Sequence, residues 1–85
     1  MKELLLFKSP TCGPCKLFAP VCKQVADQLG ITLIEVDVST PDGLAIAKEY
    51  QISHSGCALY KESNEVKYRW ERPVPANVML ADLQK

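Results

Sequence analysis

Two cysteines three positions apart, Cys12 and Cys15, are the residues of this chain whose chemistry is most readily interpreted. A Gly-Pro pair separates them, an apolar run at residues 4–7 precedes them, and apolar residues at helical spacing follow them. This arrangement predicts that Cys12 lies at the N-terminus of a helix, where backbone N–H groups and the helix dipole stabilise a thiolate. We therefore expect the pKa of Cys12 to lie below the ordinary thiol value of about 8.5.

This spacing favours dithiol–disulfide exchange. Cys12 would be the exposed nucleophile, and Cys15, one turn further along the helix, would resolve the mixed disulfide and release the substrate. Pro14 supports this interpretation because a proline in the first helical turn removes no intrahelical hydrogen bond. Two other uses of the C-x-x-C spacing stay open, namely half of a zinc site and a purely structural disulfide.

Length and composition restrict the class of protein. The chain has 85 residues, 47% of them hydrophobic, which predicts one small domain over residues 1–85 with a modest core. The formal net charge of zero gives no indication of binding to nucleic acid or to an anionic membrane. No apolar run approaches the ~18 residues of a membrane span, and the N-terminus lacks the shape of a signal peptide. We expect a cytoplasmic protein rather than a secreted scaffold built on its four cysteines.

The apolar pattern predicts an α/β protein with the element order β-α-β-α-β-β-α. The expected strands are residues 4–7, 31–38, 57–60 and 66–70, and the expected helices are residues 16–29, 44–50 and 76–84. A helix between the first two strands predicts a right-handed parallel connection, and the short segment 62–65 predicts a hairpin. We expect a four-stranded mixed sheet with the first strand central and helices on both faces.

Several side chains have expected positions within these elements. Cys22 is interpreted as a small buried hydrophobe, and Gly30 as the C-terminal cap of the first helix. Trp70 is expected to be partly buried against the last helix, on a strand with one face in water. The apolar stripe of the first helix is expected to contain Leu17, Phe18, Val21, Cys22, Val25 and Leu29.

The chain resembles the thioredoxin superfamily. Cys12 to Lys16 reads Cys-Gly-Pro-Cys-Lys, which is similar to the family's active-site motif, and Pro20 falls where that family carries a kink proline in its first long helix. The resemblance covers essentially the whole chain and extends through the second strand and the helix that follows it. It implies a thioredoxin fold and a thiol–disulfide oxidoreductase that acts as an electron carrier.

The resemblance also implies partners and site residues. It implies a monomer that needs no cofactor beyond its own cysteine pair, a thioredoxin reductase or equivalent donor, and disulfide-containing clients such as ribonucleotide reductase. A glutathione-linked, glutaredoxin-like reductant is the nearer alternative, although glutaredoxins usually have a Pro-Tyr inner pair. The implied catalytic residues are Cys12 and Cys15, and the implied substrate-binding residues are Thr11, Gly13, Pro14, Ser55 and Gly56.

Three departures from the family pattern concern this site. Thr11 stands where a Trp is usual, and Leu6 stands where the family has a buried Asp that helps to move protons for the second cysteine. Proton transfer would then need water or another group; Glu35 is one candidate, although it also fits a partly exposed strand residue. A family cis-proline is replaced by Ser55 or Gly56, and a trans bond is expected there because a non-proline cis bond costs about 2.5–4 kcal/mol.

The loop that lacks this proline carries two further metal-ligand types, His54 and Cys57. If they lie near Cys12 and Cys15, the set could bind zinc or an iron–sulfur cluster, which gives a second functional class, a metal-binding module. In the simpler interpretation Cys57 points into the core and His54 lies in solvent. A third class is an interaction domain with this fold and no redox role.

Overall fold

The computed structural model describes residues 2–10, 12–52 and 55–84. Its element order is β-α-β-α-β-β-α, so the predicted α/β class and order are confirmed. The elements are β1 (Lys2–Lys8), α1 (Gly13–Leu29), β2 (Thr32–Asp37), α2 (Pro41–Glu49), β3 (Cys57–Glu62), β4 (Glu65–Trp70) and α3 (Ala76–Leu83). No helix in the described part of the chain is long and apolar enough to cross a membrane.

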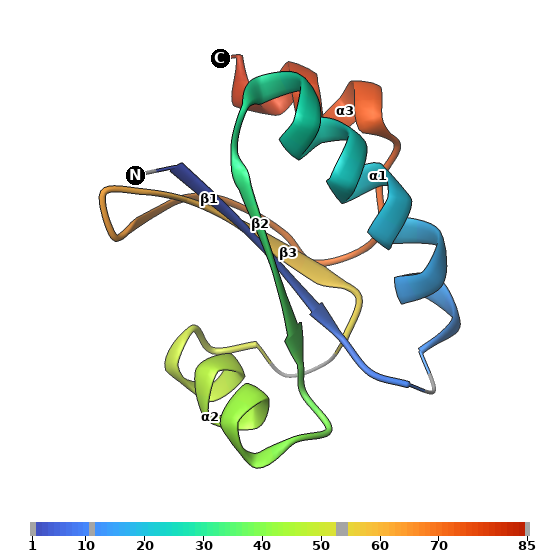
Figure 1. Cartoon of the computed structure of the whole chain (residues 1–85), viewed down its shortest axis with the longest axis vertical. Coiled ribbons are helices and arrows are strands. Elements are labelled where there is room, and N and C mark those ends of the chain that lie inside the picture. Colours follow the sequence, from blue (N-terminus) through green and yellow to red (C-terminus); the bar gives the residue numbers. More distant parts are fainter. Residues whose placement is uncertain (1, 11, 53–54, 85) are drawn as a thin grey trace.

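The four strands form one mixed sheet in the order β2-β1-β3-β4. β1 pairs in parallel with β2 and antiparallel with β3, and β3 pairs antiparallel with β4. β1 is therefore internal to the sheet, as its continuous apolar run predicts. Figure 1 shows α1 and α3 together on one side of the sheet and α2 on the other.

The sheet divides the core into two clusters because successive side chains of a strand point to opposite faces. Along β1, Leu4 and Leu6 join the cluster under α1 and α3, whereas Leu5 and Phe7 join the cluster under α2. All four side chains are buried. β1 is thus packed on both faces, and the chain that follows it leads to Cys12 at the N-terminus of α1.

The ends of α1 follow the sequence signals. Cys12 is the N-cap, Gly30 adopts a left-handed conformation (φ 66°) as the C-cap, and its N–H donates to the carbonyl of Ala26. The helix continues through Pro20. The predicted apolar stripe is wrong at Leu17 and Leu29, which are 75% and 38% exposed. Each residue advances about 100° around a helix, and this rotates Leu17 away from the buried side chains Cys15, Phe18, Cys22, Val25 and Ala26.

This difference between neighbours on α1 gives a stability prediction. Phe18 is fully buried between the sheet and α3, so Phe18→Ala should lower the free energy of unfolding by about 3–5 kcal/mol. Leu17→Ala, the matched control, should change it by less than about 0.5 kcal/mol. Urea unfolding followed by circular dichroism measures both. Equal losses for the two variants would contradict this orientation of α1.

The start of α2 depends on a close backbone approach. Thr40 caps the helix, since its Oγ1 accepts a hydrogen bond from the N–H of Gly43 at 3.0 Å, and Pro41 occupies the first turn. α2 therefore begins three residues before the predicted position 44. A Cβ placed on Gly43 would lie 1.7 Å from the carbonyl oxygen of Asp37, so no larger side chain fits there without moving α2 away from the end of β2.

The hairpin between β3 and β4 is confirmed. Its turn residues Ser63 and Asn64 both have positive φ (55° and 67°), as a two-residue turn matched to strand twist requires. The prediction of a single wet face on β4 is wrong, because Tyr68 is exposed in addition to the charged residues. Trp70 is more deeply buried than expected, and its Nε1–H donates to Asp82 of α3 at 2.9 Å.

Candidate functional site

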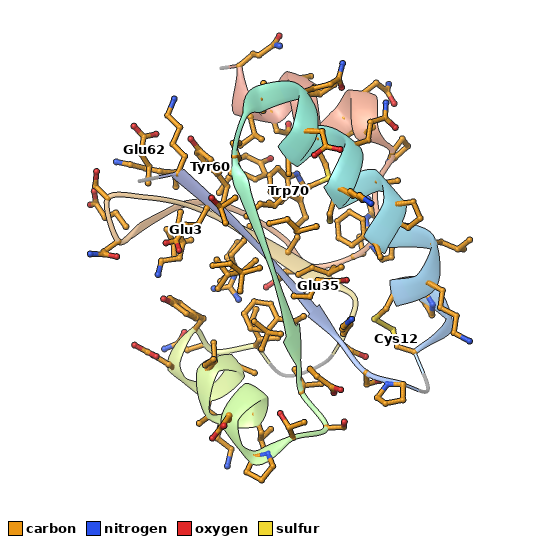
Figure 2. The ribbon with its side chains drawn as sticks, in the orientation of Figure 1. Glu3, Cys12, Glu35, Tyr60, Glu62 and Trp70 are labelled. Atoms are coloured by element: carbon orange, nitrogen blue, oxygen red, sulfur yellow. A yellow bond between two sulfur atoms is a disulfide. The ribbon has the colours of Figure 1, made fainter. Side chains whose placement is uncertain are left out.

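Cys12 and Cys15 form a disulfide at the N-terminus of α1, with an S–S distance of 2.15 Å (Figure 2). Cys12 lies one residue outside the helix, as predicted, and Cys15 lies within its first turn. The backbone N–H of Cys15 donates to Sγ of Cys12 at 3.1 Å, so the outer sulfur occupies the position of a helix-capping acceptor. The first turn of α1 holds no acidic residue that would oppose negative charge on this sulfur.

The two sulfurs differ in access. Cys12 is half-buried, whereas Cys15 is only 3% exposed. Sγ of Cys15 lies 3.7 Å from the carbonyl oxygen of Phe7 at the end of β1. An attacking sulfur from another molecule can therefore approach Cys12 and not Cys15. This asymmetry is the one that a nucleophile with a resolving partner needs.

Gly56 lies against the disulfide. A Cβ on this residue would lie 3.9 Å from each of the two sulfurs, and its φ of +87° is one that residues with side chains rarely adopt. Its N–H donates to the carbonyl of Phe7 at 2.7 Å, which ties the loop to β1. No cis peptide bond occurs among the described residues, which include the Ser55–Gly56 bond. The backbone of Gly56 therefore lies against the sulfurs on this side.

The other predicted contact residues lie around the same point. Gly13 and Pro14 are exposed in the first turn of α1, and Ser55 is half-buried beside Gly56. The predicted residues Thr11 and His54 lie outside the described part of the chain. The structure thus brings the first turn of α1 and Gly56, from the distant loop before β3, together at the disulfide.

The simpler interpretation of Cys57 is confirmed, because its side chain lies in the core and does not join the cysteine pair. Strand alternation turns Cys57 toward the α2 side of the sheet, where it is 1% exposed and its thiol donates to the carbonyl of Glu71 at 3.6 Å. Within the described ranges, no three Cys, His, Asp or Glu side chains are grouped so as to hold a metal ion. A metal centre with Cys12, Cys15 and Cys57 as three ligands is therefore not formed here.

Cys22 and Cys57 are both thiols in buried surroundings. Burial, together with the nearby carboxylate of Glu35, raises the pKa of Cys22 to about 12. Burial also raises the pKa of Cys57, with a smaller contribution from Glu71. Both stay protonated at neutral pH and are poor nucleophiles, so the exchange chemistry falls to Cys12 and Cys15.

A cavity of about 270 Å³ lies beside Cys15, and no pattern in the sequence predicts it. It is lined by Cys15 from α1, by Lys8 at the end of β1, and by Glu35 and Asp37 of β2. Nζ of Lys8 is 3.3 Å from Oε1 of Glu35. A second unpredicted feature is the carbonyl oxygen of Phe7, which lies near Sγ of Cys15 and accepts a hydrogen bond from the N–H of Gly56. Because it is a backbone atom, the identity of the residue does not predict its role.

Comparison with known proteins gives a family match and relatives. The family model described as Thioredoxin matches residues 1–82. The chain is 37% identical over 82 residues to a thioredoxin of Pyropia yezoensis, covering 96% of this chain and 77% of that protein. It is 34% identical over 82 residues to a thioredoxin-like protein of Synechocystis, covering 95% and 77%. The chain spans only 44% of the chloroplastic M-type thioredoxin of Spinacia oleracea, with 29% identity over 79 residues.

Solved structures show the same fold. Thioredoxin 1 of Thermosipho africanus superposes with a TM-score of 0.84 at 15% identity, covering 96% of this chain and 90% of that one. At this identity the likeness concerns the fold, which is the thioredoxin fold that the resemblance implied. Together with the match over residues 1–82, it leads to one conclusion: this chain belongs to the thioredoxin family.

Proposed function

We propose that this protein is a dithiol–disulfide oxidoreductase that reduces disulfides in client proteins. The observation that carries the proposal is the bond between Cys12 at the N-cap of α1 and Cys15 buried behind it. The two sulfurs are close enough to bond, and only the outer one is open to another molecule. Membership of the thioredoxin family supports the same activity.

The proposed reaction starts from the reduced pair. The Cys12 thiolate, stabilised by the N-terminus of α1, attacks one sulfur of a client disulfide, and the other client sulfur leaves as a thiolate and takes a proton. Cys15 then attacks Sγ of Cys12, the bond between Cys12 and the client breaks, and the second client thiol is released. The product is the Cys12–Cys15 disulfide, so two electrons pass to the client and no cofactor takes part.

The proposed client contacts surround the outer sulfur. Gly13 and Pro14 are exposed in the first turn of α1, while Gly56, next to the half-buried Ser55, approaches the sulfurs from the loop before β3. Thr11 completes the proposed set. With Gly56 in place of a bulkier residue, a client chain can approach the disulfide closely over bare backbone.

The proposed electron donor is a thioredoxin reductase or an equivalent enzyme. A segment of the Arabidopsis thaliana protein named NADPH-dependent thioredoxin reductase 3 is 29% identical to this chain over 63 residues, which are 12% of that protein. A domain of this family therefore occurs within a reductase chain, in keeping with direct electron transfer between the two kinds of protein. Ribonucleotide reductase is a proposed client, as the resemblance to the thioredoxin superfamily implies.

The proposed compartment is the cytoplasm. A protein that reduces disulfides in its clients needs a supply of reducing equivalents, which the cytoplasm maintains. Subcellular fractionation with an antibody against the protein tests this proposal. Recovery in an organelle or in the medium would overturn it.

An insulin-reduction assay with dithiothreitol as donor tests the function. We expect the wild type to accelerate insulin precipitation, Cys12→Ser to reduce the rate to that of dithiothreitol alone, and Cys57→Ala to keep most of the wild-type rate. Cys57→Ala is the matched control because its thiol is buried on the other side of the sheet. Full activity in Cys12→Ser, or no activity in the wild type, would refute the proposal. A parallel assay with glutathione as donor distinguishes a glutaredoxin-like reductant, which would be active with glutathione, from the proposed function.

A further inference from the structure

Cys15 must lose a proton before it can act, and its surroundings give that proton no direct exit. In the resolving step its sulfur needs to be a thiolate, yet the side chain is 3% exposed and faces the carbonyl of Phe7. A carbonyl oxygen accepts a hydrogen bond and does not take up a proton. A proton acceptor with access to Cys15 is therefore required.

The cavity beside Cys15 provides that access. Its volume of about 270 Å³ is enough for several water molecules, since one occupies roughly 30 Å³ in the liquid. The wall contains polar side chains, so water entering the cavity finds hydrogen-bond partners. The neighbouring strand β1 supplies no acid at this level of the sheet, because Leu6 stands opposite Glu35 in the parallel register.

Two carboxylates line the cavity, and only one is suited to accept a proton. Oδ1 of Asp37 accepts hydrogen bonds from the N–H of Ser39 at 2.9 Å and from its hydroxyl at 2.6 Å, which lower the pKa of Asp37. Asp37, the last residue of β2, is therefore a weak base whose carboxylate is hydrogen-bonded to Ser39 in the turn before α2. Glu35 instead lines the cavity and meets Lys8 in a half-exposed ion pair, so its side chain is accessible to solvent.

The position of Glu35 follows from the alternation of β2. Leu33 packs on the cluster under α1, whereas Ile34 packs on the cluster under α2. Glu35 is therefore on the same face as Leu33, the face that carries the disulfide, and Figure 2 shows it on that strand beneath α1. The charged or titratable groups that face it are Lys8 from β1, Asp37 from β2, and Lys16, Cys22 and Lys23 from α1.

We propose that Glu35 accepts the proton of Cys15 through water in this cavity; the proposal rests on the function proposed above. As the proton moves to the Glu35 carboxylate, the electron pair of the Cys15 sulfur forms the bond to Sγ of Cys12. The bond between Cys12 and the client breaks, and its electron pair leaves on the client sulfur. When a donor later reduces the disulfide, Glu35 returns the proton to Cys15. Glu35 thus acts as a proton-transfer residue through water and touches neither the client nor the sulfurs.

The experiment resolves the two chemical steps. Reduced protein in excess is mixed with 5,5′-dithiobis(2-nitrobenzoate), and the coloured thiolate is followed in a stopped-flow instrument. The first release reports attack by Cys12, and the second reports resolution by Cys15. The released thiolate needs no proton, so the second phase isolates the deprotonation of Cys15.

We expect Glu35→Gln to slow the second phase about tenfold at pH 7 and to leave the first phase unchanged. The difference from wild type should close above roughly pH 9, where hydroxide removes the thiol proton without help. Glu35→Asp should restore most of the rate because it keeps a carboxylate. Lys8→Gln is the matched control, since it breaks the same ion pair and leaves the carboxylate in place.

Three results would overturn the proposal. The first is an unchanged second phase in Glu35→Gln. The second is a slowing that is the same at every pH, or equal in Lys8→Gln, since either would indicate that the ion pair only positions the strand. The third is a slowing of the first phase together with the second. Absence of any first phase in the wild type would instead refute the oxidoreductase function itself, so the two failures are distinguishable.

Discussion

Replacing Gly43 with valine is expected to lower the free energy of unfolding by about 4 kcal/mol or more, a large part of the stability of a small domain. The Cβ of any side chain at this position would lie 1.7 Å from the carbonyl oxygen of Asp37, far inside contact distance. That oxygen also accepts the hydroxyl hydrogen of the capping residue Thr40 at 2.8 Å, so it is not free to move. Thermal unfolding followed by circular dichroism measures the loss.

Gly13→Ala is the control for this substitution. Gly13 also lies in the first turn of a helix, but nothing comes within 4 Å of a Cβ placed there. Alanine at a helical position is favoured over glycine by up to about 1 kcal/mol, so the control should unfold at the wild-type temperature or slightly above it. Similar losses in Gly43→Val and Gly13→Ala would contradict the close approach of α2 to the end of β2.

Replacing Cys15 with serine is expected to stop turnover and to trap the client on the protein. Cys12 keeps its position at the N-cap of α1 and still attacks, but no thiol remains behind it to release the mixed disulfide. Pre-reduced Cys15→Ser mixed with insulin and quenched with iodoacetamide should yield a covalent adduct at Cys12, detected by mass spectrometry. The wild type should yield free insulin chains and its own internal disulfide instead.

Cys22→Ala provides the matched control for the trapping experiment. Cys22 is a fully buried thiol two turns further along α1, with a pKa raised to about 12, and takes no part in the proposed exchange. Its alanine variant should behave as the wild type and form no lasting adduct. An adduct in Cys22→Ala, or its absence in Cys15→Ser, would show that resolution does not depend on Cys15.

The order of the elements could be predicted because each has a local signal. The apolar run at residues 4–7 is long enough for a strand and too short for a helix, and Gly30 ends α1 with a positive φ of 66°. The start of α2 was predicted too late, because Thr40 and Pro41 act through a cap rather than through apolar spacing. Leu17 was assigned to the apolar stripe because it directly precedes Phe18 in the spacing pattern. Its angle around the helix axis instead places it outside that stripe, in solvent.

The candidate site was only partly predictable. The cysteine pair and its place at a helix N-terminus follow from four adjacent residues, and the structure forms that pair. The orientation of Cys57 depends on the register of β3, which a one-residue slip would reverse, so the sequence alone left two interpretations of this residue open. The cavity containing Glu35 depends on the parallel pairing of β1 with β2, and a single strand does not carry that information.

The hydrogen bond from the backbone N–H of Cys15 to Sγ of Cys12 affects the reduction potential of the cysteine pair. Such a bond is stronger when the sulfur is a thiolate, and the N-terminus of α1 adds to the same preference. Whatever stabilises the reduced form relative to the disulfide raises the reduction potential, by about 30 mV for each 1.4 kcal/mol. The first turn of α1 therefore favours the reduced form, and a change of charge there would shift the reduction potential without moving either sulfur.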